Sequence, residues 1–397
     1  MSQKLINHSP DLKRLRDEGY EVEIRHGHLL VHSVPYVNAS KQIRRGTLVS
    51  ELSLAGEVTV KPSTHVIHFQ GDFPCSHKGV PIEQIRYVSS KSKLASDIEV
   101  EHSFSNKPSA GYKDYYEKFA QYIMIISHPA KALDSGVDPR TFKPVPELPD
   151  DSVFKYVDTA SSRAGIQAIS EKLSSQRIAI VGLGGTGSYI LDFVAKTPVR
   201  EIHLFDNDIF QSHNAFRAPG AASFGDLCQA KSKVDYFSQI YSQMHSGVIA
   251  RPLRISKDTV SELTAFNFIF LCVDDGPCKK VILEALATSD TIVIDVGMDV
   301  QLVEQALLGT CRVTTCTKDK RDHVSSRISM GENYEDAAYA SNIQIVELNA
   351  LNACLAVIKW KQLSEFYQDL EHEHHLTYST NCALLDAGDA YHENQII

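Results

Sequence analysis

The sequence predicts an α/β protein with a doubly wound, mostly parallel sheet, preceded by a smaller α+β domain. From about residue 178 onward, short apolar runs alternate with segments of helical period. Alternation of this kind favours parallel strands joined by crossover helices. The first apolar run leads into Gly182-Leu-Gly184-Gly185-Thr-Gly187, and such a glycine-rich turn opens the helix of nucleotide-binding βαβ units. The predicted sheet is therefore Rossmann-like.

The elements of this α/β part follow in order, each short strand being rich in β-branched and aromatic residues. The predicted strands cover residues 178–181, 201–206, 266–273, 291–296 and 305–317. The predicted helices cover residues 188–196, 226–245, 278–288 and 343–367. Pro198 ends the first helix, because proline cannot continue a helical hydrogen-bond pattern.

The preceding part of the chain predicts a separate module. A capped helix at 9–18 and a hairpin turning at Gly27 come before an amphipathic helix that begins at residue 115. Four prolines between residues 138 and 151 indicate a stiff linker. We expect an N-terminal α+β module at 1–145, an α/β domain at 151–370 and a polar C-terminal tail at 371–397, in which the His374-His375 pair is solvated.

The composition is that of an ordinary globular protein. Of the 397 residues, 43% are hydrophobic and 22% are charged, with a net charge of −9. A nucleic-acid partner would require a basic stripe, which this chain lacks. No apolar run approaches the roughly 20 residues of a membrane helix, and the first residues have no signal-like apolar segment. The eight scattered cysteines are typical of reduced thiols, so we expect a cytoplasmic protein.

The glycine turn is a candidate phosphate site. Glycines let the backbone approach phosphate oxygens, and the helix that follows offers free N–H groups and the positive end of its dipole. Asp206 stands about 20 residues further on, after the next strand, where an acid accepts hydrogen bonds from ribose hydroxyls. This arrangement fits NAD as well as ATP. A tight turn without a ligand is the plain alternative.

Three later segments discriminate between these nucleotides. They are Asn214-Ala-Phe-Arg217, the helix start at Lys231-Ser-Lys233, and a strand that ends before Asp274. Hydride transfer has no evident need for these groups. Attack on an α-phosphate does, because cations neutralise a triphosphate and an acid holds Mg²⁺.

Taken together, these motifs resemble the ThiF/MoeB superfamily of adenylyltransferases, which includes the catalytic half of ubiquitin-activating enzymes. The resemblance covers residues 158 to 351 or so. It rests on five ordered motifs: Gly182–Ser188, Asp206–Asp208, Asn214–Arg217, Lys233-Val234 and Asp274-Asp275. Asp275 departs from the family pattern, which usually has Asn at this position.

The resemblance implies a role for each matched residue. The implied nucleotide ligands are Gly182, Gly184, Gly185, Gly187, Asp206, Asp208, Asn214, Arg217 and Lys233. Asp206 would hold the ribose, and Arg217 would bind the β- and γ-phosphates together with the Asn of its motif. Lys233 would stabilise charge at the α-phosphate, with Lys231 as the alternate. Asp274 would coordinate Mg²⁺, and Lys279 stands where the family often has an Arg.

The resemblance also implies partners. The substrate would be the C-terminal carboxylate of a ubiquitin-like β-grasp protein, activated with ATP for conjugation or sulfur transfer, and a conjugating enzyme is a further partner. Relatives are homodimers, in which Arg163 would reach the partner's site. We expect no zinc in the α/β domain, because Cys311 and Cys316 do not form the paired C-x-x-C motifs of zinc-binding relatives.

A thiol nucleophile is an open question. Cys316 lies beside a cluster of basic residues that would favour the thiolate, and it is a stronger candidate than Cys311. A small core residue is the alternative for both. In the N-terminal module, Phe69-Gln-Gly-Asp-Phe-Pro74 resembles the strand-to-loop segment of ubiquitin-conjugating folds. The alternative there is a β-rich docking module.

Two other functions stay open. An NAD(P)-dependent oxidoreductase would use the glycine turn and Asp206, but it would leave Arg217, Lys233 and Asp274 without a role. A non-catalytic scaffold would bind a nucleotide or a ubiquitin-like protein without turnover.

Overall fold

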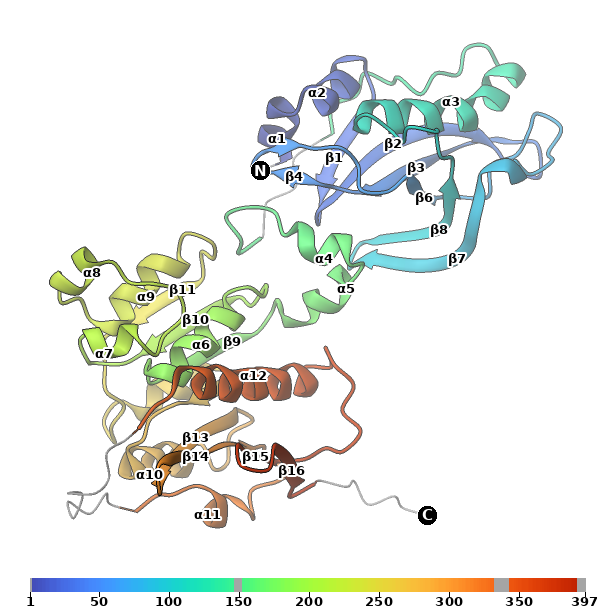
Figure 1. The fold of residues 1–397 in the computed structure, drawn as a ribbon. Coiled ribbons are helices and arrows are strands. Elements are labelled where there is room, and N and C mark those ends of the chain that lie inside the picture. The colour runs from blue at the N-terminus through green and yellow to red at the C-terminus, as the bar shows by residue number, and fades with distance from the viewer. Residues whose placement is uncertain (1, 146–151, 332–342, 391–397) are drawn as a thin grey trace, which may run out of the picture. The chain divides into compact units, whose positions relative to one another are not determined.

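The computed structural model describes residues 2–145, 152–331 and 343–390. The chain divides into two compact units, Met1–Ser152 with Tyr156–Glu171 and Val153–Lys155 with Lys172–Ile397 (Figure 1). Residues 146–151, on which the second half of the expected linker and the expected domain boundary fall, lie outside the described residues. No helix of the described chain is long and apolar enough to cross a membrane.

The first unit is an antiparallel sheet covered by helices. The strands lie in the order β1-β2-β3-β6-β8-β7. Their bounds are Glu21–Arg25 (β1), His28–Val37 (β2), Ile43–Glu51 (β3), Val66–Gln70 (β6), Arg86–Ala95 (β7) and Ile98–Ser105 (β8), and Leu54–Ala55 (β4) pairs with Val58–Thr59 (β5). The helices are Ser2–His8 (α1), Pro10–Asp17 (α2), Tyr115–Leu133 (α3), Thr159–Arg163 (α4) and Gln167–Ser170 (α5). The expected α+β module is confirmed, and β1 and β2 form the hairpin predicted around Gly27.

The second unit contains an eight-stranded sheet in the order β11-β10-β9-β12-β13-β14-β15-β16. The strands are Arg177–Val181 (β9), Glu201–Phe205 (β10), Val248–Arg251 (β11), Phe268–Leu271 (β12), Ile292–Val303 (β13), Ala306–Cys316 (β14), His375–Ser379 (β15) and Leu384–Gly388 (β16). The helices are Gly185–Val194 (α6), Ser212–Ala215 (α7), Phe224–Cys228 (α8), Lys233–Tyr241 (α9), Gly276–Ala285 (α10), Val324–Arg327 (α11) and Val346–Leu363 (α12). From β11 to β13 neighbouring strands are parallel, and from β13 to β16 they are antiparallel. The predicted doubly wound, mostly parallel sheet is confirmed.

Burial on both faces explains the apolar runs of these strands. In β9, Ile178 and Ile180 pack with α6 and α12, whereas Ala179 and Val181 pack with α10 on the opposite face (Figure 1). Alternate residues of a strand point to opposite faces, so a sheet covered by helices on both sides selects a continuous apolar strand. This rigid centre positions the loops at the ends of the strands.

Two expectations for this unit are wrong. The helix expected at 226–245 is divided into α8 and α9, because Ala230 adopts a positive φ of 46° and the Ser232 side chain caps α9 by accepting from the Asp235 N–H. The expected polar tail contributes two strands instead. β15 pairs with β14 and β16 pairs with β15, and His374 and His375 are buried rather than solvated. The open edge of β14 takes up this segment, because an unpaired strand edge offers backbone groups that a polar strand also satisfies.

Candidate active site

Three parallel strands end at one level, and the predicted site residues follow them. The last residues of β9, β10 and β12 are paired in register. The next residues along the chain are Gly182, Asp206 and Cys272, which therefore lie at the same edge of the sheet. Ligands of open α/β sheets bind at this carboxyl edge.

The glycine turn is closely packed at Gly182 and Gly187 and open at Gly184. Gly182 has φ +93°, and a Cβ there would lie 2.8 Å from the carbonyl oxygen of Cys272. A Cβ on Gly187 would lie 2.0 Å from the carbonyl oxygen of Gly182. At Gly184, the N-cap of α6, a Cβ would meet no described atom within 4 Å. The first N–H groups of α6 have no partner within the helix and offer an anion site at its positive end.

A lysine and two acids converge beside this turn. The Nζ of Lys233 lies 2.7 Å from an Oδ of Asp208 and 3.5 Å from an Oδ of Asp206. Asp206 also accepts from the N–H of Leu183, 2.7 Å away, which ties its carboxylate to the glycine turn. Only 7% of Lys233 is exposed. Lys231, in contrast, is partly exposed and bonds Gln239, so the geometry favours Lys233 over the alternate.

The loop after β10 holds two donors that lack acceptors. The Oδ1 of Asn214 accepts from the N–H of Gln211 at 2.9 Å. The Nδ2 of Asn214 and the Nε of Arg217 are buried and have no hydrogen-bond partner among the described residues. A buried donor without an acceptor costs about 1–3 kcal/mol, and it calls for a specific explanation. An anionic ligand such as a phosphate would supply the missing acceptor, so this donor set fits a nucleotide.

The acids after β12 divide into an exposed one and a structural one. Asp274 is exposed. Asp275 caps α10 by accepting from the N–H of Cys278, and it forms an ion pair with Arg254 at 2.6 Å. Mg²⁺ is commonly held by one or two carboxylates, phosphate oxygens and water, so the Asp274 carboxylate is suited to be a Mg²⁺ ligand. The described residues contain no group of three or more His, Cys, Asp or Glu that could hold a metal by themselves.

Lys279 belongs to a buried charge cluster. Its Nζ lies 2.6 Å from Asp295, which also pairs with Arg312 at 2.7 Å. Asp295 is completely buried, so both cations balance a core carboxylate. Lys279 is therefore engaged in the fold at the place where the family often has an Arg.

The structure favours the core-residue alternative for the candidate nucleophile Cys316. Cys316 and Cys311 are both fully buried in the strand β14. Burial raises the pKa of the Cys316 thiol to about 12 and that of Cys311 to about 11, so neither forms a thiolate at neutral pH. The neighbouring lysines, at positions 318 and 320, pair with aspartates instead.

Arg163 is the last residue of α4, which the structure groups with the first unit. Its side chain is not among those described, so its proposed reach into a partner's site stays a prediction.

Sequence reasoning missed Asn349. This residue lies on α12, and its Oδ1 accepts from the Oγ1 of Thr186 in the glycine turn at 2.8 Å. The available signal was the pair Asn349 and Asn352, one helical turn apart in a stretch that is otherwise apolar.

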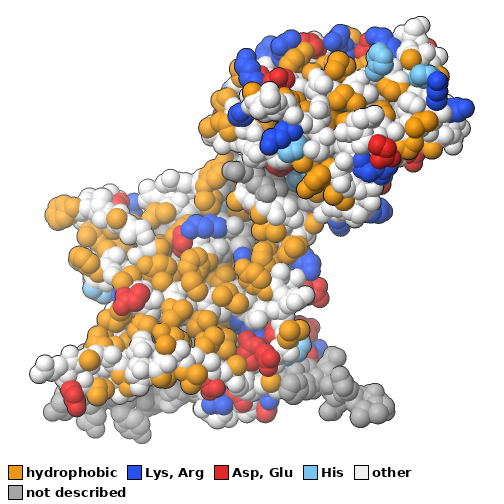
Figure 2. Space-filling model, turned by 45° about the vertical axis from the view of Figure 1, so that its right-hand side comes forward, with side chains coloured by type: hydrophobic (Ala, Val, Ile, Leu, Met, Phe, Trp, Pro, Cys, Tyr) orange, Lys and Arg blue, Asp and Glu red, His pale blue; other side chains and the backbone are white. Residues whose placement is uncertain are grey.

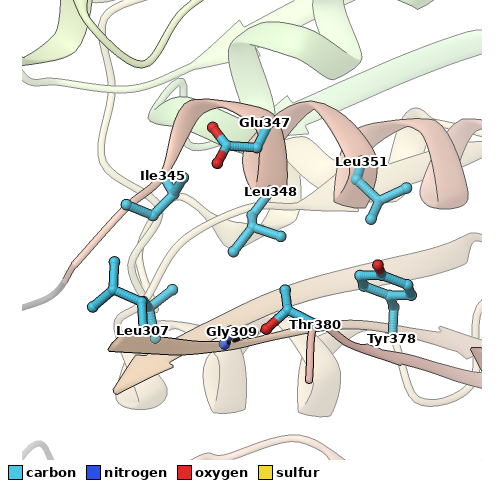
Figure 3. Close-up of a pocket in the computed structure, with 9 residues that line it drawn as sticks. Leu307, Gly309, Ile345, Glu347, Leu348, Leu351, Tyr378 and Thr380 are labelled. Carbon is cyan, nitrogen blue, oxygen red and sulfur yellow. Dashed lines mark hydrogen bonds between the residues drawn. The ribbon is translucent and has the colours of Figure 1, made fainter. Parts of the chain in front are cut away.

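An apolar pocket of about 370 Å³ lies on another side of α12. Figure 3 shows Ile345, Leu348 and Leu351 of the helix segment facing Leu307 and Tyr378 of the sheet. Figure 2 shows broad hydrophobic surface on the second unit, and Ile358 of α12 is 44% exposed. This lining suits apolar side chains rather than a nucleotide.

Comparison with known proteins agrees with the motifs. The ThiF family model matches residues 160–358, half of the chain, so the chain belongs to the ThiF family. Residues 10–159 match a domain of unknown function, DUF6791. The resemblance inferred from the sequence is thereby confirmed.

Individual relatives are distant. The adenylyltransferase and sulfurtransferase UBA4 of Saccharomyces cerevisiae, strain YJM789, is 25% identical over 141 residues, which are 35% of this chain and 30% of the relative. The chain thus spans less than a third of that protein's length. Among solved structures, Escherichia coli MccB with MccA-N7isoASN has a TM-score of 0.45 at 14% identity, covering 59% of this chain and 72% of MccB. PaaA has a TM-score of 0.44 at 16% identity, covering 56% of this chain and 75% of PaaA.

Proposed function

We propose that this protein uses ATP to adenylylate a C-terminal carboxylate. The observation that carries the proposal is the position of Lys233, which is held beside the glycine turn by Asp206 and Asp208. A buried lysine at this place suits a charged triphosphate and has no part in hydride transfer. The unpaired donors of Asn214 and Arg217 support the same conclusion, because they lack anionic acceptors in the described chain.

In the proposed reaction, different residues bind different parts of the ATP molecule. The first N–H groups of α6, with Asn214, Arg217 and Lys233, would bind the phosphates, and Asp206 would bind the ribose. One carboxylate oxygen of the substrate forms a bond to the α-phosphorus while the bond from that phosphorus to the pyrophosphate oxygen breaks. The products are an acyl-adenylate and pyrophosphate. Fixed cations around the α-phosphate lower the barrier, because they stabilise the charge that builds up there.

Magnesium would complete the site. Asp274 is the residue that would hold it, with phosphate oxygens and water as the other ligands. When bound, the ion neutralises charge on the leaving pyrophosphate.

The proposed substrate is a ubiquitin-like protein with a β-grasp fold. The family membership supports this proposal, and the matched yeast relative is named as an adenylyltransferase and sulfurtransferase. Under the same proposal the protein acts in the cytoplasm as a homodimer, with Arg163 serving the partner's site. The acceptor of the activated carboxylate is then a thiol or a sulfur carrier outside β14, because Cys316 is buried.

Exchange of labelled pyrophosphate into ATP tests the proposal. The full chain is incubated with MgATP and candidate small β-grasp proteins encoded beside its gene. Each candidate is matched by a variant that lacks its last two residues. Exchange that requires the intact C-terminus supports carboxylate activation. Failure of every candidate, together with reduction of NAD or NADP, would establish the oxidoreductase instead.

A further inference from the structure

The first turns of α12 place a polar side chain against the glycine turn. Asn349 is only 1% exposed. Its Oδ1 accepts a hydrogen bond of 2.8 Å from the hydroxyl of Thr186, the second residue of α6. The two helices are therefore joined by a side-chain bond at the point where α6 begins.

The amide of Asn349 also packs tightly on the neighbouring glycine. A Cβ on Gly185 would lie 2.2 Å from the Nδ2 of Asn349 and 2.3 Å from its Cγ. The space that any other residue at 185 would need is already filled by this amide. Asn349 consequently limits how far the first turn of α6 can shift toward α12.

Stability explains only one half of the Asn349 amide, the Oδ1 that accepts from Thr186. Its Nδ2 is buried without a hydrogen-bond partner in the described part of the chain. An apolar residue would avoid the cost of that unpaired donor, and most of α12 is apolar. Local rules of stability are commonly broken at functional sites. Asn352, one turn later, also has a buried polar atom without a partner among the described residues, its Oδ1. It differs from Asn349 in position, because its Nδ2 donates to the carbonyl of Gly297 at 2.9 Å and none of its bonds reaches the glycine turn.

We propose that Asn349 is a positioning residue for the nucleotide. It holds Gly185 and Thr186 in place, so that the first N–H groups of α6 meet the phosphates as a preformed cradle. Preformed donors bind an anion more tightly than mobile ones, because no ordering cost is incurred on binding. The inference rests on the proposed function, which places a nucleotide over this turn, and adds a residue that lies outside the five sequence motifs.

The test is the affinity of the full chain for ATP in the presence of Mg²⁺, measured by calorimetry alongside the thermal midpoint. Asn349→Ala and Thr186→Val each remove the bond between the helices, and each is expected to raise the Kd about two- to tenfold, the worth of one hydrogen bond. The double variant is expected to be close to Asn349→Ala, because the two residues act as a unit. Asn352→Ala is the matched control. It removes a buried Asn of the same helix and is expected to leave the Kd within about twofold of wild type.

The outcomes separate the two proposals. If Asn349→Ala and Thr186→Val bind ATP as tightly as wild type, or if Asn352→Ala weakens binding equally, the positioning role is overturned while the proposed function stands. If Asn349→Ala does not fold, Thr186→Val carries the test. If the wild-type chain does not bind ATP at all, the proposed function fails and the inference fails with it.

Discussion

Replacement of Lys233 by Met removes the charge that the structure places beside the glycine turn. Lys231→Met is a matched control, because it removes the same charge two residues earlier from a partly exposed side chain that bonds Gln239. We expect Lys233→Met to fold, to bind ATP weakly and to lose pyrophosphate exchange. We expect Lys231→Met to behave as wild type.

The magnitudes follow from the contacts. Lys233 is nearly buried, but Asp208, its partner at 2.7 Å, has a side chain that is 65% exposed. The pair is therefore intermediate between exposed and buried ion pairs, and its loss should lower the free energy of unfolding by about 1–3 kcal/mol. Asp206 keeps its bonds from the N–H groups of Leu183 and Asp208. A charge-assisted contact to phosphate is worth about 1.5–3 kcal/mol, so the Kd for ATP should rise roughly 10- to 150-fold.

Calorimetric titration with MgATP and the exchange assay measure these effects, and chemical denaturation shows whether the variant is folded. The exchange rate should fall about 10²- to 10³-fold, as it does when a group that stabilises transition-state charge is removed. Unchanged ATP affinity in Lys233→Met, with no exchange in either form, would refute the reasoning and favour the non-catalytic scaffold. Equal losses in both variants would show that the effect is not local to the turn.

The other predictions concern single positions. Gly182→Ala forces a side chain into a positive φ and against Cys272, so it should cost about 1–3 kcal/mol in denaturation experiments. Asp274→Asn should raise the Mg²⁺ concentration needed for half-maximal exchange. Cys316→Ala should leave exchange intact, and in the native protein this thiol should resist alkylation at neutral pH. Lys118 of α3 is fully buried, and burial lowers its pKa from 10.5 to about 8. Between pH 8 and 10.5 the unfolded chain therefore holds a proton that the folded protein has lost, so the stability of the wild type rises with pH in this range. Lys118→Met should therefore stabilise the fold by about 1–3 kcal/mol below pH 8, and a denaturation series should show that gain vanishing above pH 10.5.

Features that depend on neighbours in the chain could be predicted from the sequence. The strand β9, the glycine turn and α6 form one continuous segment. The apolar residues of β10 and of β12 likewise lie within one short segment each. The sequence left two candidate lysines, Lys231 and Lys233. The choice between them depends on how residues 231–233 pair with residues 208–210, where the N–H of Phe210 donates to the carbonyl of Lys231.

Features that depend on distant segments could not be predicted. Residues 375–379 contain no continuous apolar run, and pairing with β14 and β16 makes them a strand. Asn349 meets Thr186 across 163 positions of the sequence. Basic neighbours suggested a reactive Cys316, but the fold directs the thiol into the core and pairs those lysines with aspartates. In each case the structure of the segment, or the role of the residue, depends on a tertiary contact that the local sequence pattern does not predict.

The fate of the α-phosphate of ATP tests the central claim most directly. The full chain is mixed with a small protein substrate that supports exchange and with ATP labelled at either the α- or the γ-phosphate. The account predicts that α-label becomes attached to the carboxyl end of the substrate and is released by neutral hydroxylamine, whereas γ-label leaves as pyrophosphate. Attachment of γ-label, or absence of any labelled substrate while ATP is consumed, would contradict adenylylation by this site.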